Sequence, residues 1–169
     1  MGSIVLGLHV SGSAIEGIGR LDDTLGRLDD ELLRARTFGR PVSVAMIAPE
    51  PAKPGPRHVA RWQARLHEVL GPLDHVSLYA PDTVLCAMPE TSAADAERIM
   101  TVLASPDRTP RLVAGVATAP EAGSTAEELL EAARDSLGRA SVEAPVQRAR
   151  PRTPESERGR ELVVRSAAM

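Results

Sequence analysis

Few residues of this chain have the types and spacing that catalysis or metal binding requires. His58, His67 and His75 do not show the i, i+4 spacing with which one helix face presents two ligands to a metal. The single cysteine, Cys86, excludes a disulfide framework and a cysteine-based zinc site. Because Cys86 stands in a short apolar run, we expect a small buried thiol rather than a nucleophile. The sequence also lacks a glycine-rich phosphate-binding loop, so these residues alone define no catalytic centre.

The composition excludes two classes of partner. The 169 residues include one Phe, one Trp and one Tyr, too few for the aromatic platforms on which single-stranded nucleic acids stack. The formal net charge of −3 gives no basic footprint for a nucleic acid. No apolar run approaches the roughly 18 residues of a membrane span, and the N-terminal stretch has no charged leader region. We therefore expect a cytoplasmic protein that binds neither nucleic acid nor membrane.

The first element that could position functional side chains is an amphipathic helix, expected over residues 13–38. Its apolar residues recur at spacings of three and four, and Gly39 follows at the position of a C-terminal cap. The sequence Gly-Arg-Leu-Asp-Asp occurs at 19–23 and again at 26–30, which creates a short heptad seam. Two interpretations remain: the helix packs on its own domain, or the seam forms a homodimer interface. The seam consists of Ile18, Leu21, Leu25, Leu28 and Leu32.

The elements after this helix predict an α+β fold. We expect a strand at 41–47, a helix at about 59–70, a hairpin of strands at 75–79 and 83–88, a helix capped by Thr91 or Ser92, and a strand at 111–117. A last helix begins with the capping box of Thr125 and Glu128. This order is the ferredoxin-like βαββαβ arrangement, with one additional helix before it and one after it. Such a sheet is antiparallel, and we expect its helices mainly on one face.

The chain divides into a body at 13–141 and two ends. Residues 142–160 contain Pro, Arg and Glu with almost no apolar periodicity, which predicts a flexible linker within a tail at 142–169. The charge balance changes at the same place. Residues 1–140 hold 14 basic and 19 acidic residues, whereas residues 141–169 hold six Arg and four Glu.

The element order, together with five short stretches, resembles the GGDEF (diguanylate cyclase) domain over about Ile15–Ser141. The stretches are Glu31–Val44, where a helix runs into a strand, Asp74–Tyr79 before the hairpin, Met88–Ser92 after it, Val113–Thr118 and Ala126–Ala133. The resemblance implies a nucleotide-cyclase-like fold. It also identifies the positions at which the family's GTP chemistry would take place.

The family's signature hairpin falls on Ala80–Val84, and most of it is altered. Ala80 and Pro81 replace the two glycines that let the backbone approach guanine and phosphates. Asp82 is retained, whereas Thr83 replaces the neighbouring acidic residue. A lone aspartate in a hairpin is typical of a turn.

The positions of the family's metal and phosphate ligands are altered as well. The metal-binding aspartates at the end of the first strand fall on Ala48 and Glu50, and one carboxylate does not offset the charge of two Mg²⁺ ions. Lys53 matches a family lysine just after this motif. The family's phosphate-contacting lysine falls on Ser141.

The family's inhibitory site for cyclic di-GMP is also incomplete. It requires an Arg and an Asp three residues apart before the hairpin, and this chain has Gly71 and Asp74. Without the arginine, bidentate recognition of phosphate or guanine is lost. The resemblance therefore implies no catalytic residue, no metal and no cofactor. It leaves four candidate ligand-binding residues: Glu50, Lys53, Asp74 and Asp82.

Both ends of the chain resemble parts of other domains. Glu161–Met169 resembles the opening of the AAA+ ATPase domain of bacterial sigma-54-dependent transcription activators, with Val164 in place of a glycine. Gly2–Leu6 is similar to the last strand of a forkhead-associated domain. The two resemblances imply that residues 1–12 end a preceding sensor domain and that residues 161–169 begin an ATPase.

These features favour a catalytically inactive GGDEF-like regulatory domain. It would act by protein contacts, through homodimerisation and control of an adjoining sigma-54 activator ATPase. The alternative is a module that senses a nucleotide or another small molecule in the remnant of the cyclase cleft. An active cyclase would need the carboxylates that the sequence lacks.

Overall fold

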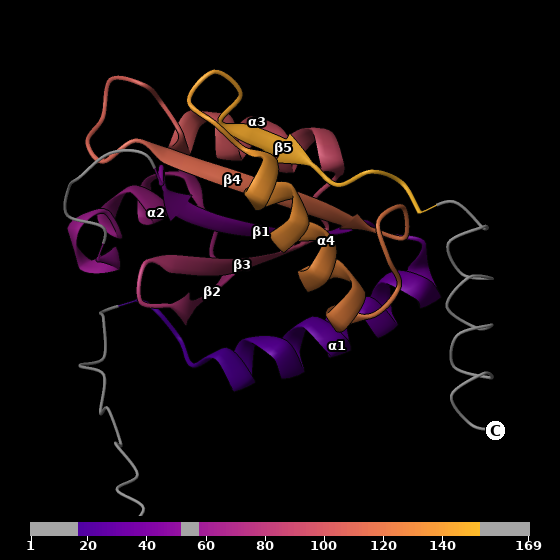
Figure 1. Ribbon diagram of the computed structural model, residues 1–169. Helices are drawn as coiled ribbons and strands as arrows, with labels where there is room; N and C mark the ends of the chain where they lie inside the picture. The colour runs from indigo at the N-terminus through magenta and orange to yellow at the C-terminus, as the bar shows by residue number, and fades with distance from the viewer. Residues whose placement is uncertain (1–16, 52–57, 153–169) are drawn as a thin grey trace, which may run out of the picture.

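The computed structural model describes residues 17–51 and 58–152, which form a five-stranded sheet with helices (Figure 1). The strands are β1 (Val42–Pro49), β2 (His75–Ala80), β3 (Thr83–Pro89), β4 (Leu112–Ala119) and β5 (Val146–Arg148). They lie in the order β2-β3-β1-β4-β5, and the pairs β1–β3, β1–β4 and β2–β3 are antiparallel. The first four strands have the split βαββαβ connectivity, so the predicted α+β fold class is confirmed.

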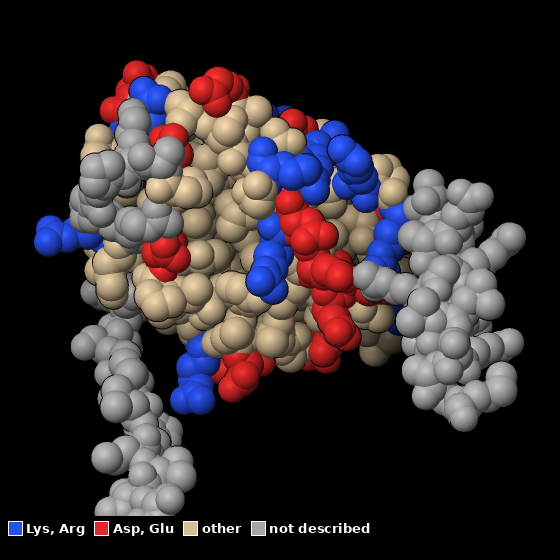
Figure 2. All heavy atoms as spheres, viewed as in Figure 1, with Lys and Arg blue, Asp and Glu red and all other residues tan. Residues whose placement is uncertain are grey.

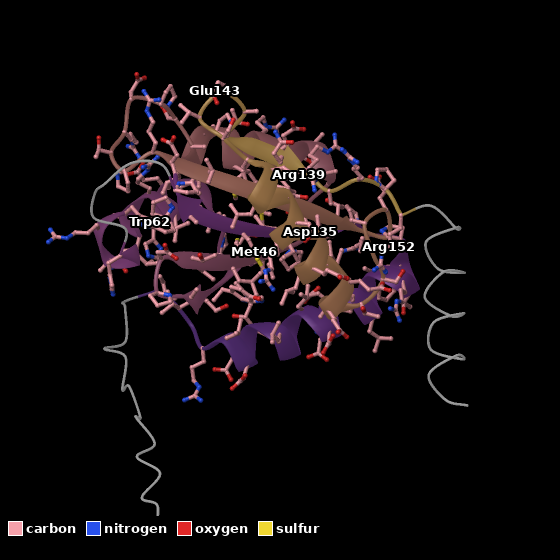
Figure 3. The ribbon with its side chains drawn as sticks, in the orientation of Figure 1. Met46, Trp62, Asp135, Arg139, Glu143 and Arg152 are labelled. Carbon is pink, nitrogen blue, oxygen red and sulfur yellow. The ribbon has the colours of Figure 1, made fainter. Side chains whose placement is uncertain are left out.

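Helices cover both faces of this sheet, and the expectation that they lie mainly on one face was wrong. The helices are α1 (Leu21–Phe38), the short 3₁₀ helix η1 (Val59–Arg61), α2 (Ala64–Val69), α3 (Ala93–Leu103) and α4 (Ala126–Arg139). Every residue of β1 and β4 is buried, because successive side chains point to opposite faces and each face has its own core. Ile47 of β1 belongs to the core that includes α3, and its neighbour Met46, labelled in Figure 3, belongs to the core beneath α1 and α4. No helix in the described ranges is both long and apolar enough to cross a membrane.

Helix α1 begins later than the sequence predicts. Residues 13–16 lie outside the described residues, and Ile18 precedes the helix instead of lying on its face. The neighbouring Gly19 forms a parallel bridge with Ser77 of β2, and its N–H donates to the Val76 carbonyl at 2.7 Å. Ile18 therefore packs against the core that includes α3. The predicted cap is present, since Gly39 adopts a left-handed conformation with φ of 65°.

The proposed heptad seam lies largely inside the domain. Leu28 and Leu32 are 0% and 4% exposed, and they belong with Val44, Leu85 and Leu129 to the core beneath α1 and α4. Side chains buried in this way pack within their own domain, which favours the first of the two interpretations for these leucines. Leu21 and Leu25 are half-buried at the margin of the same core.

The predicted linker from residue 142 was wrong for residues 142–152. Strand β5 pairs with β4 in parallel, and the Ala114 N–H donates to the Pro145 carbonyl at 2.8 Å. Arg152 then forms ion pairs with Glu128 and Glu131 of α4. The described body therefore extends to Arg152. Residues 1–12 and 161–169, for which neighbouring domains were expected, and residues 153–160 of the predicted linker lie outside the described residues.

The predicted capping box at the start of α4 is confirmed. The Thr125 hydroxyl accepts from the Glu128 N–H, and the Glu128 carboxylate accepts from the Thr125 and Ser124 N–H groups. The Ser124 N–H is the largest cause of a lowered pKa of Glu128, and Arg152 contributes in the same direction although burial opposes both. A carboxyl whose pKa is lowered by folding stabilises the fold above its unfolded pKa, and this stabilisation is lost as the pH falls through the folded pKa.

Replacing Glu128 with glutamine is expected to lower the free energy of unfolding by about 1 kcal/mol at neutral pH. Because the lost stabilisation needs an ionised carboxyl, the difference from the wild type should shrink below about pH 4. Urea denaturation across this pH range measures both effects. Glutamine can still accept the capping hydrogen bonds, so the variant removes their charge assistance and the ion pair with Arg152. Glu127→Gln is the matched control, because it removes the same charge from the same helical turn at a residue that takes no part in the capping box. An equal loss in the two variants would assign the effect to the helix dipole instead.

Candidate functional site

The hairpin between β2 and β3 carries the candidate Asp82. Ala80 of β2 pairs with Thr83 of β3, after a register shift between Leu78 and Ala80. The Thr83 hydroxyl donates to the Asp82 carboxylate at 3.1 Å, as is common for an aspartate in a turn. Pro81 has no N–H, so this position of the hairpin tip cannot donate a backbone hydrogen bond to a ligand.

Glu50 lies at the same end of the sheet as this hairpin. Ile47 pairs with Val84, which places the end of β1 beside the start of β3. The Glu50 N–H donates to the Arg111 carbonyl at 2.9 Å, and the side chain is buried at 8% exposure. Residues 17–51 and 58–152 contain no group of three or more His, Cys, Asp or Glu side chains that could hold a metal ion. The two carboxylates therefore share one end of the sheet without forming a recognisable metal centre.

Asp74 lies at the opposite end of the sheet. It precedes β2, whose first residue His75 pairs with Ala87 near the far end of β3. Its carboxylate accepts the Gly71 N–H at 2.6 Å and so closes its own turn. Burial raises the pKa of Asp74, and the Gly71 hydrogen bond partly opposes this shift. The candidate residues thus do not meet in one site, and the fourth of them, Lys53, lies outside the described residues.

The contacts of Ser141 and the burial of Cys86 indicate structural roles for both residues. The Ser141 hydroxyl donates to the Glu143 carboxylate at 2.9 Å within the turn that leads into β5. Cys86 is completely buried in β3, and burial raises the pKa of its thiol well above the usual value. A thiol without access to solvent or thiolate character is not a nucleophile.

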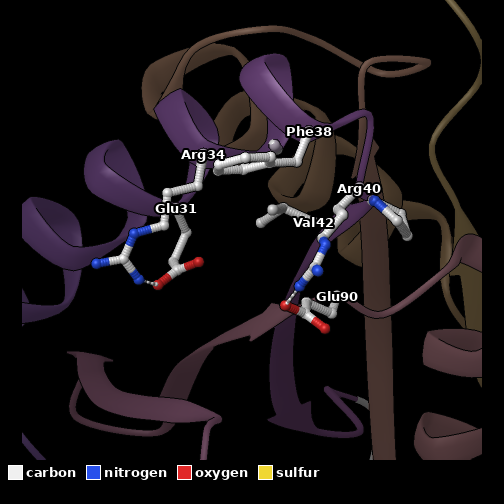
Figure 4. A pocket seen from close by; sticks show the side chains of 8 residues that line it. Glu31, Arg34, Phe38, Arg40, Val42 and Glu90 are labelled. Carbon is white, nitrogen blue, oxygen red and sulfur yellow. Dashed lines mark hydrogen bonds and ion pairs between the residues drawn. The ribbon is translucent and has the colours of Figure 1, made fainter.

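A small pocket of about 270 Å³ lies near the C-terminal end of α1 (Figure 4). Arg34 is 2.7 Å from Glu31, and Arg40 is paired with Glu90. The two arginines lining this pocket are therefore held by carboxylates that also line it. Phe38 stands at its edge and is 69% exposed.

A larger groove lies between α1 and α4, and sequence reasoning missed it. Its volume is about 1020 Å³, and its lining includes acidic side chains of both helices. The signal was present in the sequence, because Glu127, Glu131 and Asp135 follow one another at a spacing of four. Only the structure places this row opposite Asp29 of α1.

The architecture is that of GGDEF domains, to which several similar solved structures belong. No family sequence model and no curated protein sequence matches the chain. The expected GGDEF-like fold is confirmed by the structural similarity.

Three solved structures illustrate the likeness. The GGDEF domain of YfiN (TpbB) from Pseudomonas aeruginosa has a TM-score of 0.68 and 21% identity, over 81% of this chain and 93% of its own. The active GGEEF domain of a diguanylate cyclase from Vibrio cholerae has a TM-score of 0.67 and 11% identity, over 81% and 100%. The diguanylate cyclase SiaD from Pseudomonas aeruginosa, solved with its activator SiaC, has a TM-score of 0.62 and 16% identity, over 75% and 56%. At these identities the likeness shows the fold alone.

Proposed function

We propose that this chain is a catalytically inactive GGDEF-like regulatory domain that acts through protein contacts. The composition of the hairpin end of the sheet carries the proposal. Phosphoryl transfer with two metal ions needs several carboxylates at one place to offset their charge. At this end the candidates are Glu50 and Asp82, and Asp82 is hydrogen-bonded within the turn itself.

The backbone at the hairpin tip supports the same proposal. Glycines would leave open N–H groups and space beside the chain for a guanine or a phosphate. Ala80 adds a Cβ atom here, and Pro81 adds a ring and removes a donor. Ser141, where the resemblance implies a phosphate-binding lysine, has no positive charge to offer.

The partners remain part of the proposal. We propose that the domain homodimerises and controls an adjoining sigma-54 activator ATPase, as the resemblance of residues 161–169 implies. SiaD, a cyclase of similar fold that was solved in complex with its activator SiaC, is a precedent for a protein partner. A bias of a few kcal/mol between two conformations is enough for such control.

Incubation with GTP and either Mg²⁺ or Mn²⁺ tests the absence of catalysis. We expect no cyclic di-GMP above the enzyme-free blank, whereas an active GGEEF domain assayed in parallel gives product. Turnover that Asp82→Ala or Glu50→Gln abolishes would overturn the proposal. Calorimetry with GTP and with cyclic di-GMP tests the alternative, and tight saturable binding of either would favour a nucleotide-sensing module.

A further inference from the structure

The groove between α1 and α4 has a largely apolar floor. Leu25 of α1, Tyr79 of β2, and Ala126 and Leu130 of α4 line it. All four side chains are half-buried, and from below they pack against the core beneath α1 and α4. Their remaining surface faces the groove. An apolar strip of this kind favours an occupant with an apolar face of its own.

The walls of the groove are acidic. Asp29 on α1 faces Glu127, Glu131 and Asp135 on α4, and Arg134 is the one basic residue in the lining. All four carboxylate residues are exposed. Figure 2 shows acidic side chains gathered in a stripe over α4. Four carboxylates against one guanidinium repel an anionic ligand, a nucleic acid or an anionic lipid surface, and they attract a cation.

The chain itself shows that this wall accepts a guanidinium group. Arg152, labelled in Figure 3 with Asp135, forms an ion pair with Glu128 and lies 3.7 Å from the Glu131 carboxylate. Glu131 also lines the groove, so the contact with Arg152 lies at its margin. The remaining wall residues continue the acidic surface from this contact.

We propose that the groove binds a cationic amphipathic helix of a partner protein. The lining runs along α4 from its N-cap residue Thr125 to Asp135, about 15 Å at 1.5 Å per residue, which matches roughly three turns of a bound helix. Apolar side chains of the partner would lie on Leu25 and Leu130, and its arginines or lysines would reach the walls. The inference rests on the proposed function in that both assign the domain a protein partner.

A synthetic peptide provides the test. The probe is a fluorescently labelled helix of about 14 residues, with Leu at i, i+3, i+4 and i+7 positions and Arg elsewhere. We expect saturable binding in anisotropy titrations at physiological ionic strength. The variant Asp29→Asn/Glu127→Gln/Asp135→Asn should weaken binding by about tenfold or more. Leu130→Gln should weaken it as well, with the melting temperature of each variant measured to establish folding.

A matched control variant separates the groove from overall charge. Glu68→Gln/Glu97→Gln/Asp107→Asn also removes three carboxylates, all of them outside the groove lining, and should leave binding within about twofold. Equal loss in this control would overturn the proposal. Equal binding of a peptide with Ser in place of every Leu would also overturn the proposal. Binding would then come from general charge attraction, without contacts to the apolar floor of the groove.

Two further results identify other occupants. The first is sedimentation of the chain without peptide. If the chain self-associates and the groove variant does not, the occupant of the groove is a second copy of the chain and not a partner helix. The second is a comparison of the chain ending at residue 152 with the chain ending at residue 169. If the peptide binds the shorter chain and not the longer one, the occupant of the groove is the chain's own C-terminal segment. The binding assay contains no GTP, so its failure would leave the absence of catalysis standing, and turnover of GTP would leave the groove standing.

Discussion

Gly115→Val is expected to abolish folding or to lower the melting temperature by roughly 10 °C or more. Gly115 lies on β4 directly beneath α4. A Cβ atom at this position would be 2.1 Å from the Ala133 carbonyl oxygen and 2.2 Å from the Leu137 nitrogen. Both are backbone atoms of α4, which cannot turn aside as a flexible side chain would. The helix would have to separate from the sheet, and the core beneath α1 and α4 would open.

Gly26→Ala is the matched control for this substitution. Gly26 lies on the exposed side of α1, and a Cβ atom there would meet no heavy atom within 4 Å apart from the adjoining backbone of α1 itself. Alanine at a helix position is favoured over glycine by about 1 kcal/mol, so this variant should melt slightly above the wild type. Circular dichroism melts of the two variants measure the contrast. A Gly115→Val protein that melts like the wild type would contradict the close contact between α4 and β4.

Leu28→Ala has the second largest expected effect, a loss of about 2–5 kcal/mol in the free energy of unfolding. Leu28 is 0% exposed and packs in the core beneath α1 and α4. Leu33, on the same helix, is 65% exposed, so Leu33→Ala should change stability by less than about 0.5 kcal/mol. Denaturant unfolding of the two variants measures the difference.

The same measurement distinguishes the two interpretations of the leucine seam. If the side chain packs within its own domain, its truncation lowers the free energy of unfolding by the same amount at every protein concentration. A side chain that packs between two copies gives a stability that rises with concentration. We expect the Leu28→Ala loss to be equal in dilute and concentrated samples. A loss of stability that grows with protein concentration would indicate that Leu28 packs in an interface between two copies.

Local chemistry made most of the fold predictable. The β2–β3 hairpin, the Gly39 cap and the Thr125 capping box depend on residues close together in the sequence. Strand β5 was missed because three residues with partly exposed side chains carry no periodicity, and their stability comes from pairing with β4, some 30 residues earlier. The continuous apolar run of β1 already indicated a strand buried on both faces, which the expectation of one helical layer overlooked.

The candidate site was predictable by position but not by arrangement. The resemblance placed Glu50, Asp74 and Asp82 along the chain, and the sheet register decided that Asp74 lies at the other end. For the acidic wall of the groove, the sequence showed one half of the arrangement and not the other. Its spacing of four was visible on α4, whereas its partner Asp29 comes from a helix almost 100 residues earlier. Pairing across such a distance follows only from tertiary packing.

The pairing of β5 with β4 also means that a force applied to the chain after β5 is transmitted to the sheet. After α4 the chain turns back along β4, and the Arg152 N–H donates to the Glu121 carbonyl at 2.8 Å, at the end away from the hairpin (Figure 1). A pull on Arg152 along the strand would load the β4–β5 hydrogen bonds together in shear rather than one after another. The same pull would reach the first two turns of α4 through the ion pairs with Glu128 and Glu131. Tension applied at this end is thus carried into the sheet and into one wall of the groove at the same time.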